Sequence, residues 1–546
     1  MFSRNHQLIG IIKLVSCFLV IICLILACST VSSLTSSSSL LPLSVWSASA
    51  MKRIGVTEKV GGSTNITLYP ARGEYEPFQI GIQAHGTRLT NVNVSISNLS
   101  GPNDYIIPNS NITLYREHYV YVNNSSPHRG GANKPLDKGW YADGLIPFVD
   151  PLKKRDITGA SLDAVPFNLD TGKNQPIWVD IFVPRDSLAG QYRGTFTVTS
   201  NQGKSTGQIN LRVWDFELPL QPSLSSAFLF YRDQTKQASE EILRHKLNPQ
   251  FNSNPKLNLE RELIDRWGLK SVNLGFWSGA ELGNCRMFQA PSVADIRAEA
   301  ALHQPDLFKY VYSADEINDC TNLYEPMKRW GRAIHKAGFA NLAVMPPIPE
   351  LYDDGSGTGR SAVDIWVVLP SDYEKFANSI SQVLQKGDQV WSYNSLVQDS
   401  YSPKWQIDFA PLNFRIQPGF LSQSLGLTGL LYWRVDLWTS NPWNDIHTFF
   451  AKNDNNRFYP GDGMLVYPKE QVGVKGVVPS IRLKWLREGV EDYEYVEILK
   501  NLGQTDRALK VSKLVGHNWQ NWTHNPQVLE SARRQLGEQI ERINRL

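Results

Sequence analysis

Two hydrophobic patterns follow one another along the chain. From residue 46 to 218, short runs of alternating apolar and polar residues are separated by clusters of Gly, Pro, Asn and Asp. Alternation with a period of two is typical of strands with one buried face, and frequent polar turns favour an antiparallel β-sandwich. No convincing amphipathic helix interrupts these runs. Residues 46–218 are therefore predicted to form a β-sandwich domain.

Beyond residue 222, apolar strand-like runs alternate with helical periodicity, as expected of parallel βα units. Strands are predicted at 225–232, 247–251, 271–277, 308–314, 341–346, 362–369, 389–394 and 429–435. Eight units fit a (β/α)8 barrel of the TIM type over residues 222–478, and an open doubly wound sheet is the alternative. Neither a GxGxxG motif nor a P-loop follows any strand, so nothing supports nucleotide binding.

The C-terminal residues 479–546 show the periodicity of helices. Residues 481–503 form one predicted amphipathic helix, and residues 528–543 form another. Their many charged residues are expected to form a solvated face. The predicted architecture is thus a sandwich, a barrel and a helical C-terminal segment that packs on the barrel.

The first 45 residues have the pattern of an export leader. Arg4 and Lys13 precede an apolar run over 14–28, which is at the long end for a signal peptide and short for a membrane span. The segment Ile25–Cys28 resembles a bacterial lipobox, in which Cys28 is lipidated; a plain signal peptide or an uncleaved anchor is the alternative. A Ser-rich tether follows. We expect an exported protein, extracellular, periplasmic or membrane-anchored, whose only membrane contact is this leader or its lipid.

Composition narrows the partners. The formal charge of +3 gives no support for binding to nucleic acid. Cys285 and Cys320 are the cysteines beyond the leader, and they could form a disulfide or remain two buried thiols. No His/Cys cluster indicates a metal, and no cofactor is predicted. Sixteen Trp and 21 Tyr are many for this length. Most aromatic residues fill cores, but their flat faces also stack on sugar rings.

Catalytic groups of a (β/α)8 barrel lie at the C-terminal ends of its strands. The fourth predicted strand runs directly into Asp315 and Glu316. Two acids at a strand exit could also form a helix cap or a solvated turn. Aromatic residues at the ends of the seventh and eighth strands favour a sugar site, and the candidates are Trp391, Tyr393, Trp433 and Trp438. Asp364 and Asp436 are further candidate carboxylates.

Glycoside cleavage has a use for two such acids. One must donate a proton to the leaving oxygen, and the charge that develops at the anomeric carbon needs an electron-rich partner. That partner is usually a second carboxylate about 5–5.5 Å away, but a 2-acetamido group on the sugar can attack instead. A carboxylate must then hold the acetamido N–H. Consecutive acids can divide these two tasks.

Segments along nearly the whole chain after the leader resemble glycoside hydrolase family 123 and its relatives in the domain-of-unknown-function 4091 family. Order and spacing agree throughout. The matching segments are ARGEYEPFQIGI at 71–82, DGLIPF at 143–148, QPIWVDIFVPRDSLAGQYRG at 175–194, YSADE at 312–316, VDIWV at 363–367, WSY at 391–393, LLYWRVDLW at 430–438 and PSIRLKWLREGVEDYEY at 479–495.

The resemblance implies a retaining exo-β-N-acetylgalactosaminidase that uses the 2-acetamido group of a terminal sugar as nucleophile. By position, Asp315 would orient the acetamido group and Glu316 would act as acid and then as base. The family often has Pro after the Asp-Glu pair, whereas this chain has Ile317, and that departure concerns the shape of the loop.

Two other functions remain open from the sequence. One is a glycosidase of different specificity that takes its nucleophile from another strand, with Asp364 or Asp436 as candidates. The other is a non-catalytic surface protein that binds glycans on the same scaffold.

Overall fold

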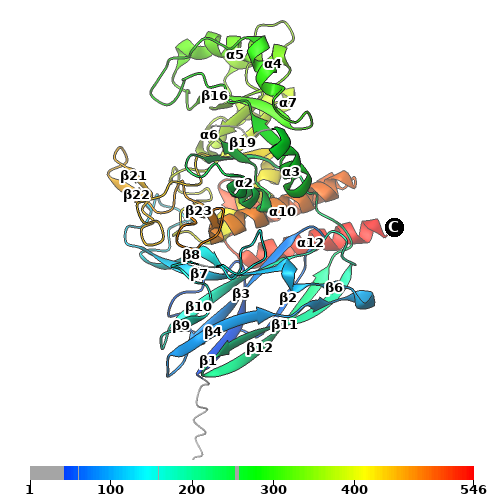
Figure 1. Ribbon diagram of the computed structural model, residues 1–546. Helices are drawn as coiled ribbons and strands as arrows, with labels where there is room; N and C mark the ends of the chain where they lie inside the picture. The colour runs from blue at the N-terminus through cyan, green and yellow to red at the C-terminus, as the bar shows by residue number, and fades with distance from the viewer. Residues whose placement is uncertain (1–41, 60, 158, 252–256, 546) are drawn as a thin grey trace, which may run out of the picture. The chain divides into compact units, whose positions relative to one another are not determined.

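The structure is a computed structural model that describes residues 42–59, 61–157, 159–251 and 257–545. The predicted leader up to residue 41, including Cys28, lies outside the described residues. Within the described part, no helix is both long and apolar enough to span a membrane. The described residues form a β-sandwich, a parallel barrel and a C-terminal group of helices (Figure 1).

The sandwich consists of two sheets. In the first, all neighbours are antiparallel, in the order β1 (Leu43–Ser49), β3 (Tyr75–Ala84), β10 (Asn174–Phe182), β7 (Ile112–Val122) and β8 (Gly139–Pro147). The second has the order β2 (Asn65–Leu68), β12 (Gly203–Val213), β11 (Gly190–Ser200), β4 (Leu89–Ile96) and β9 (Phe167–Leu169). Strand β5 (Leu99–Ser100) pairs with β11, and β6 (Ile106–Ile107) pairs with β5; two 3-10 turns, η1 (Pro102–Asp104) and η2 (Asn109–Asn111), lie next to them in the chain.

Strand β10 of the first sheet is buried on both faces. Ile177 and Val179 point into the core between the two sheets, as alternation predicts. Trp178 and Asp180, on the opposite face, are also fully buried. The outer face of this sheet is therefore covered rather than solvated, and the C-terminal helices cover it.

The barrel contains the eight predicted strands, and the predicted fold class is confirmed. Their spatial order is β14 (Pro249–Phe251), β13 (Ser225–Phe230), β20 (Gly429–Tyr432), β19 (Gln389–Tyr393), β18 (Ile365–Val368), β17 (Ala340–Val344), β16 (Phe308–Asp315) and β15 (Ser271–Asn273), all parallel. Backbone pairing stops between β14 and β15. The side chain of Asn248 bridges this seam, donating to Ser271 O at 2.9 Å and accepting from Lys270 N at 3.1 Å.

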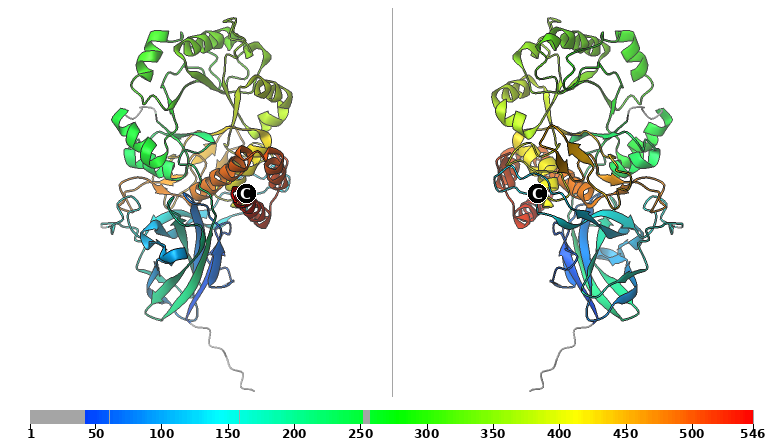
Figure 2. Two further views of the ribbon diagram at one scale, coloured as in Figure 1. Left: turned by 90° about the vertical axis from the view of Figure 1, so that its right-hand side faces the viewer. Right: turned by 90° about the vertical axis from the view of Figure 1, so that its left-hand side faces the viewer.

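Helices surround the ring of strands (Figure 2). They are α2 (Lys236–Arg244), α3 (Leu257–Trp267), α4 (Val293–Ala300), α5 (Tyr324–Ala337), α6 (Pro370–Lys375), α7 (Ala377–Lys386), α8 (Leu412–Ile416) and α9 (Ser422–Leu425), with the short turns η3 (Thr321–Leu323), η4 (Pro349–Leu351) and η5 (Gln417–Leu421). Helix α5 ends at Gly338, whose φ of 102° requires the left-handed conformation that glycine adopts without strain.

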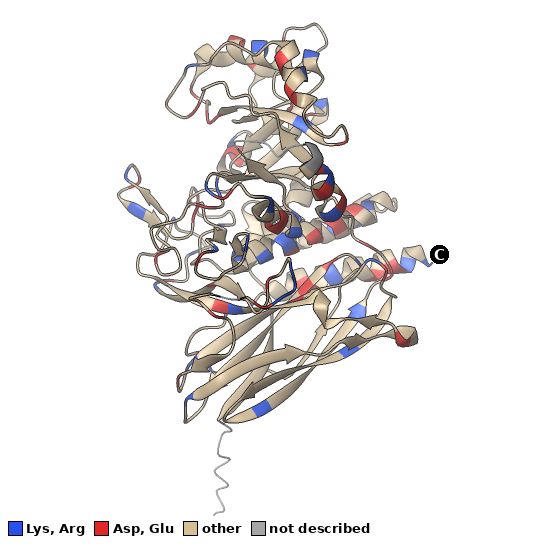
Figure 3. Cartoon of the chain, viewed as in Figure 1, with Lys and Arg blue, Asp and Glu red and all other residues tan. Residues whose placement is uncertain are grey.

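Three small hairpins and three longer helices complete the chain. The hairpins are β21 (Phe449–Ala451) with β22 (Arg457–Tyr459), β23 (Val466–Tyr467) with β24 (Val478–Pro479), and β25 (Gly516–Asn518) with β26 (Asn521–Trp522). The helices are α10 (Ile481–Asn501), α11 (Thr505–Val515) and α12 (Pro526–Asn544). Lys, Arg, Asp and Glu are interspersed along α10 and α12 (Figure 3).

The expectation that the charges of α10 form a solvated face is wrong. Arg482, Lys484 and Arg487 are at most 1% exposed, because α10 packs between the sandwich and the barrel. Lys484 Nζ lies 2.8 Å and Arg487 Nη2 lies 2.7 Å from the carboxylate of Asp180 on β10. Arg482 makes a bidentate pair with Asp143 on β8, at 2.7 and 3.0 Å. Buried charges persist only when they are paired, and here the pairs join α10 to the sandwich.

On the barrel side, Asp492 of α10 accepts two hydrogen bonds from Arg415 of α8, at 2.7 and 2.9 Å. Glu494 accepts from the backbone N and the hydroxyl of Ser223, which precedes β13, at 2.5 and 2.8 Å. Helix α10 is thus bound by charge to both domains, and its acidic and basic residues are interdomain contacts.

Candidate active site

A cavity of about 510 Å³ opens at the C-terminal ends of the barrel strands, a volume typical of small-molecule sites. Its carboxylates are Asp315, Glu316 and Glu281. The other lining residues are Leu229, Tyr231, Gln250, Phe251, Asn273, Gly275, Phe276, Trp277, Tyr312, Val344, Tyr393, Ser395, Leu431, Trp433 and Phe449. The structure therefore brings both predicted acids into one hollow with aromatic walls.

A β-bulge in β16 aims Asp315 into this cavity. Tyr312 pairs with Leu342, but the next pair joins Ala314 to Ala343, so Ser313 is an extra residue. Its hydroxyl lies 3.8 Å from the sulfur of Met327 on α5, and Ala314 belongs to the same core cluster as Met327. Two consecutive side chains thus face the outer helices. A bulge re-aims the residues that follow it, and without it strict alternation would turn Asp315 away from the cavity.

Glu316 reaches the same cavity through an uncommon backbone conformation. Consecutive strand residues normally point to opposite faces. Glu316 has a φ of 51°, in the left-handed region that residues other than glycine rarely occupy. Its backbone N donates to Val344 O at 2.7 Å, which holds the turn against β17. Such conformations cluster at functional sites, and this one places two adjacent acids side by side.

Two tyrosines hold the acids. The Tyr312 hydroxyl donates to Asp315 Oδ1 at 3.0 Å, and the Tyr393 hydroxyl donates to Glu316 Oε1 at 2.5 Å. Burial raises the pKa of Asp315 to about 6, the negative charge of Glu316 adds to the shift, and the hydrogen bond from Tyr312 opposes it. Asp315 therefore changes its charge in the range where many enzymes work.

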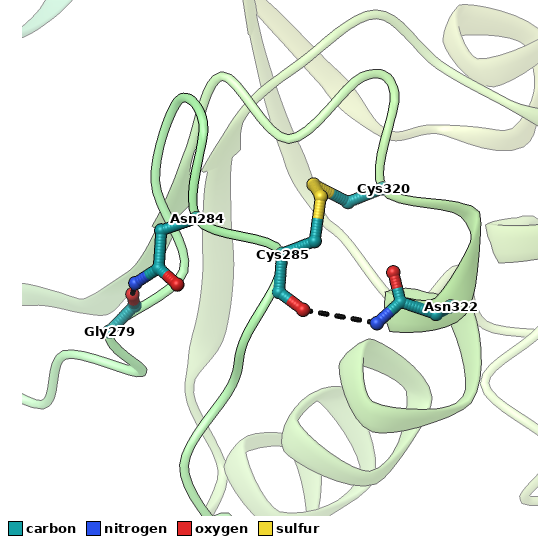
Figure 4. The surroundings of a disulfide bond; sticks show 5 residues. All are labelled: Gly279, Asn284, Cys285, Cys320 and Asn322. Carbon is teal, nitrogen blue, oxygen red and sulfur yellow. Dashed lines mark hydrogen bonds between the residues drawn. A yellow bond between two sulfur atoms is a disulfide. The ribbon is translucent and has the colours of Figure 1, made fainter.

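A disulfide ties together two loops at the mouth of the cavity (Figure 4). Cys285 lies in the loop after β15, which carries Trp277 and Glu281, and it is bonded to Cys320 in the loop after Glu316. Asn322 Nδ2 donates to Cys285 O at 3.0 Å, a second link between these loops. The sequence had left the state of these two cysteines open, and the structure pairs them.

The aromatic candidates divide into two groups. Tyr393 and Trp433 line the cavity. Trp391 does not, because it is fully buried within the barrel at the height of Gly429, where a Cβ atom would lie 2.4 Å from the Trp391 ring. Trp438 also lies outside the lining: its indole N donates to Val466 O at 2.8 Å.

Asp364 lies at the N-terminal end of its strand, away from the cavity, and its contacts indicate a structural role. It immediately precedes β18, whereas the cavity lies at the C-terminal ends of the strands. Its carboxylate accepts from Arg360 Nε at 2.7 Å and from Asn341 N at 2.7 Å, and it lies 2.9 Å from His335 Nε2. Asp364 is thus not placed to act as a nucleophile in this cavity.

Asp436 is fully buried beneath the mouth. It accepts hydrogen bonds from the backbone N atoms of Tyr231, Arg232 and Asp233, at 2.6–3.3 Å, and from Arg434 Nε at 3.2 Å. These contacts fix the loop after β13, which carries the cavity residue Tyr231. Asp436 therefore positions a wall of the site and does not line it.

Several lining residues were not among the sequence candidates. Trp277 is 40% exposed, and its ring packs edge-on against Tyr312 at a centroid distance of 5.8 Å. Trp277 ends the third predicted strand, so its position at the C-terminal end of a strand could have identified it from the sequence as a residue of the site. Phe449 packs edge-on against Trp433 at 5.6 Å, but it belongs to the β21–β22 hairpin, which no strand pattern of the barrel indicates.

A parallel barrel that gathers two acids and several aromatic rings at its C-terminal mouth has the fold and the site of a glycoside hydrolase. Family comparison agrees: the glycoside hydrolase 123 N-terminal domain matches residues 53–200, and the glycoside hydrolase 123 catalytic domain matches residues 353–499. Together these ranges span more than half of the chain, which therefore belongs to glycoside hydrolase family 123. Asp315 and Glu316 fall between the two ranges, so their assignment rests on the geometry of the cavity.

The fold is also found in a solved structure of a family 123 glycoside hydrolase from Clostridium perfringens, described as acting in glycolipid glycan hydrolysis. The two share 13% sequence identity with a TM-score of 0.60, over 92% of this chain and 98% of that one. The β-glucuronidase of Parabacteroides merdae matches at 11% identity and a TM-score of 0.26, over 83% of this chain and 51% of that one. None of the curated proteins matches the chain in sequence.

Proposed function

We propose that this glycoside hydrolase is a retaining exo-β-N-acetylgalactosaminidase that uses the 2-acetamido group of its substrate as nucleophile. The observation that carries the proposal is that Asp315 and Glu316 both line one cavity. The bulge in β16 and the left-handed backbone conformation of Glu316 point the two side chains in the same direction. A mechanism with two enzyme carboxylates would need a nucleophile from another strand or loop; the candidates Asp364 and Asp436 are bound elsewhere, and Glu281, on the loop after β15, is the remaining carboxylate of the cavity lining.

In the first step, the acetamido carbonyl oxygen attacks the anomeric carbon while Glu316 donates its proton to the departing oxygen. Asp315 accepts a hydrogen bond from the acetamido N–H and stabilises the oxazolinium ion with its negative charge. In the second step, water attacks the anomeric carbon and gives a proton to Glu316, while the bond from that carbon to the acetamido oxygen breaks and the acetamido group is restored. The exposed ring of Trp277 and the half-buried ring of Trp433 offer apolar faces to the sugar.

The choice of sugar can be tested with a pair of substrates. We expect nitrophenyl β-N-acetylgalactosaminide to be cleaved at least ~10³-fold faster, by kcat/KM, than nitrophenyl β-galactoside, because the plain sugar lacks the internal nucleophile. The corresponding N-acetylglucosaminide is the control for the configuration at C4. Comparable cleavage of the plain galactoside would exclude the acetamido group as the nucleophile.

The pH dependence of catalysis should report the ionisation of Asp315. Because the carboxylate form stabilises the oxazolinium ion, kcat/KM should fall as the pH drops through about 6, the pKa of Asp315. The hydrogen bond from Tyr312 favours the charged form, so Tyr312→Phe should raise this pKa and move the acidic limb to higher pH. Tyr324→Phe, at a tyrosine that does not line the cavity, is the control. An unmoved limb in Tyr312→Phe would contradict the assignment.

We also propose that the protein is exported and reaches an oxidising compartment. The disulfide between Cys285 and Cys320 is the bond that such a compartment maintains, and it agrees with the leader pattern of the first 45 residues. Mass spectrometry of the mature N-terminus is expected to show cleavage before Cys28 with a lipid on that residue. An intact Met1 in protein from the native host would exclude a cleaved leader.

A further inference from the structure

A second cavity, of about 330 Å³, lies between the sandwich and the first two barrel helices. It shares no lining residue with the active-site cavity. Its lining residues come from the sandwich, from the segment after β8, and from α2, α3 and the residues that flank them: Gly73, Tyr75, Asn111, Thr113, Pro151, Lys154, Phe182, Arg185, Leu220, Leu243, Arg244, Lys246, Arg266 and Trp267. We call it the cationic cavity.

The charges on its walls are all of one sign. Five lining side chains are basic, and none of the lining residues is Asp or Glu: the five are Lys154, Arg185, Arg244, Lys246 and Arg266. Arg244 and Lys246 are only 5% and 8% exposed. Lys154 and Arg266 are exposed, so the cost of burying positive charge falls on Arg244 and Lys246, and an anion would reduce it.

The arginines have carboxylate partners outside the cavity wall. Arg244 pairs with Glu241 at 2.8 Å, and Arg266 pairs with Glu262 at 3.1 Å. Arg185 pairs with Glu217, and its guanidinium packs over Gly73, where a Cβ atom would lie 3.0 Å from it. These pairs leave the positive charge of the two lysines to be balanced.

Neither lysine has a carboxylate within ion-pair distance among the described residues. Lys246 Nζ donates to Pro219 O at 3.1 Å and to Gly73 O at 3.4 Å. Within the part of the chain that the structure describes, Lys154 Nζ donates to the Thr113 hydroxyl alone, at 3.4 Å. Burial is the main cause that lowers the pKa of both ammonium groups to about 8; Glu491 and Glu494 oppose the shift at Lys246, and Asp180 and Glu241 oppose it at Lys154. The cavity thus presents one buried cation, Lys246, and one exposed cation, Lys154, to a bound anion.

Aromatic rings form the remaining wall. The rings of Tyr75 and Phe182 lie 4.8 Å apart, and the guanidinium of Arg266 stands 5.3 Å from the centroid of Trp267. Indole faces stack on the C–H faces of sugar rings, and a volume of this size holds a sugar with its substituents. The combination of cationic and aromatic walls selects a ligand that has both a negative charge and a flat apolar face.

We propose that the cationic cavity is a non-catalytic binding site for an anionic saccharide. The sulfate or carboxylate of the sugar is bound by Lys154 and Lys246, and its ring packs on Trp267. Such a ligand contacts the sandwich and the barrel at once, so the enzyme holds a charged part of a glycan apart from the residue that it cleaves.

Calorimetric titration of the full chain with N-acetylgalactosamine 4-sulfate tests the site, in the presence of saturating uncharged N-acetylgalactosamine to occupy the active-site cavity. We expect saturable binding that Lys154→Gln weakens about tenfold or more, the usual effect of losing a charge-assisted contact. Lys153→Gln is the matched control, because Lys153 is the adjacent lysine and does not line the cavity. Arg266→Gln is a second variant, at a side chain that is 58% exposed.

Three outcomes would overturn the proposal. The first is no binding, or equal binding by wild type and both cavity variants. The second is equally tight binding of inorganic sulfate, which would mean that the cavity takes only an ion. The third is binding that occurs only when N-acetylgalactosamine is omitted, which would place the sulfated sugar in the active-site cavity. None of these outcomes depends on turnover, so the proposed activity stands or fails separately.

Discussion

Replacing Glu316 by Gln is expected to lower kcat by about 10²–10⁴-fold on a substrate with a poor leaving group, because the amide cannot donate a proton to the departing oxygen. The substitution keeps the size of the side chain, and the hydrogen bond from Tyr393 can still form. Initial rates with alkyl and nitrophenyl β-N-acetylgalactosaminides provide the measurement. Asp319→Asn, three residues further along the same loop and outside the cavity lining, is the control.

The leaving group separates the roles of the two acids. A nitrophenolate departs with little protonation, so the loss in Glu316→Gln should be much smaller for the nitrophenyl substrate than for the alkyl one. Asp315→Asn should reduce both rates by similar large factors, because its contact with the acetamido group is independent of the leaving group. The reverse pattern would exchange the two assignments, and near-normal rates in either variant would remove its role.

Asp180→Asn is expected to reduce the free energy of unfolding by about 3–5 kcal/mol, the cost of leaving buried charges without their partner. The carboxylate of Asp180 is fully buried between Lys484 and Arg487 of α10. The amide would leave Lys484 without its carboxylate partner, and Arg487 would keep Glu488 and Glu491. Urea unfolding at pH 7, followed by tryptophan fluorescence, measures the change.

An exposed aspartate provides the matched control for this experiment. Asp306 pairs with Arg261 at 2.7 Å, but the two side chains are 49% and 42% exposed. Asp306→Asn should therefore cost no more than about 1 kcal/mol. Equal losses in the two variants would show that the buried pairs of α10 do not hold the domains together.

The contribution of Asp180 to the free energy of unfolding should decrease only when the pH is lowered. Burial alone would raise its pKa, but Arg487 and Lys484 outweigh burial and hold the pKa well below its usual range. A group with a depressed pKa stabilises the fold above its unfolded pKa, which is about 3.9 for Asp. The difference between wild type and Asp180→Asn should therefore stay constant from pH 8 to 5 and shrink only in stronger acid.

The hydrophobic pattern was sufficient to predict the barrel. All eight strands lie where alternating strand and helix periodicity predicted them, including the short strand β14 (Pro249–Phe251). The pattern reports which segments are buried, and in a parallel barrel almost every strand is buried on both sides. The two acids were predicted for the same reason, since strand direction alone places the residue after β16 at the mouth.

The height of a side chain inside the barrel could not be predicted from the sequence. Trp391 and Tyr393 lie two residues apart on β19 and face the same interior, yet only Tyr393 reaches the cavity. The level of Trp391 depends on the stagger of β19 against β20, where it pairs with Gly429. Stagger is a property of the whole ring of strands, and no local pattern records it.

The environment of α10 was also beyond the sequence pattern. Charged residues are usually exposed, so Arg482, Lys484 and Arg487 were assigned to a solvated face. Their partners Asp143 and Asp180 lie more than 300 positions earlier in the chain, within strands that read as ordinary parts of the sandwich. A buried ion pair can be predicted from a sequence only when its two residues are already known to be in contact in the fold.

The catalytic activity of this enzyme depends on the single bulge in β16. If β16 kept all its residues but lost the bulge, strict alternation would turn Asp315 toward the outer helices, while the strand kept its neighbours β15 and β17. The protein would still contain the Asp-Glu pair, and its cavity would still enclose a sugar between aromatic rings. A descendant of this kind would be a lectin with the sequence signature of a hydrolase, so the bulge between Tyr312 and Asp315 matters as much as the two acids themselves.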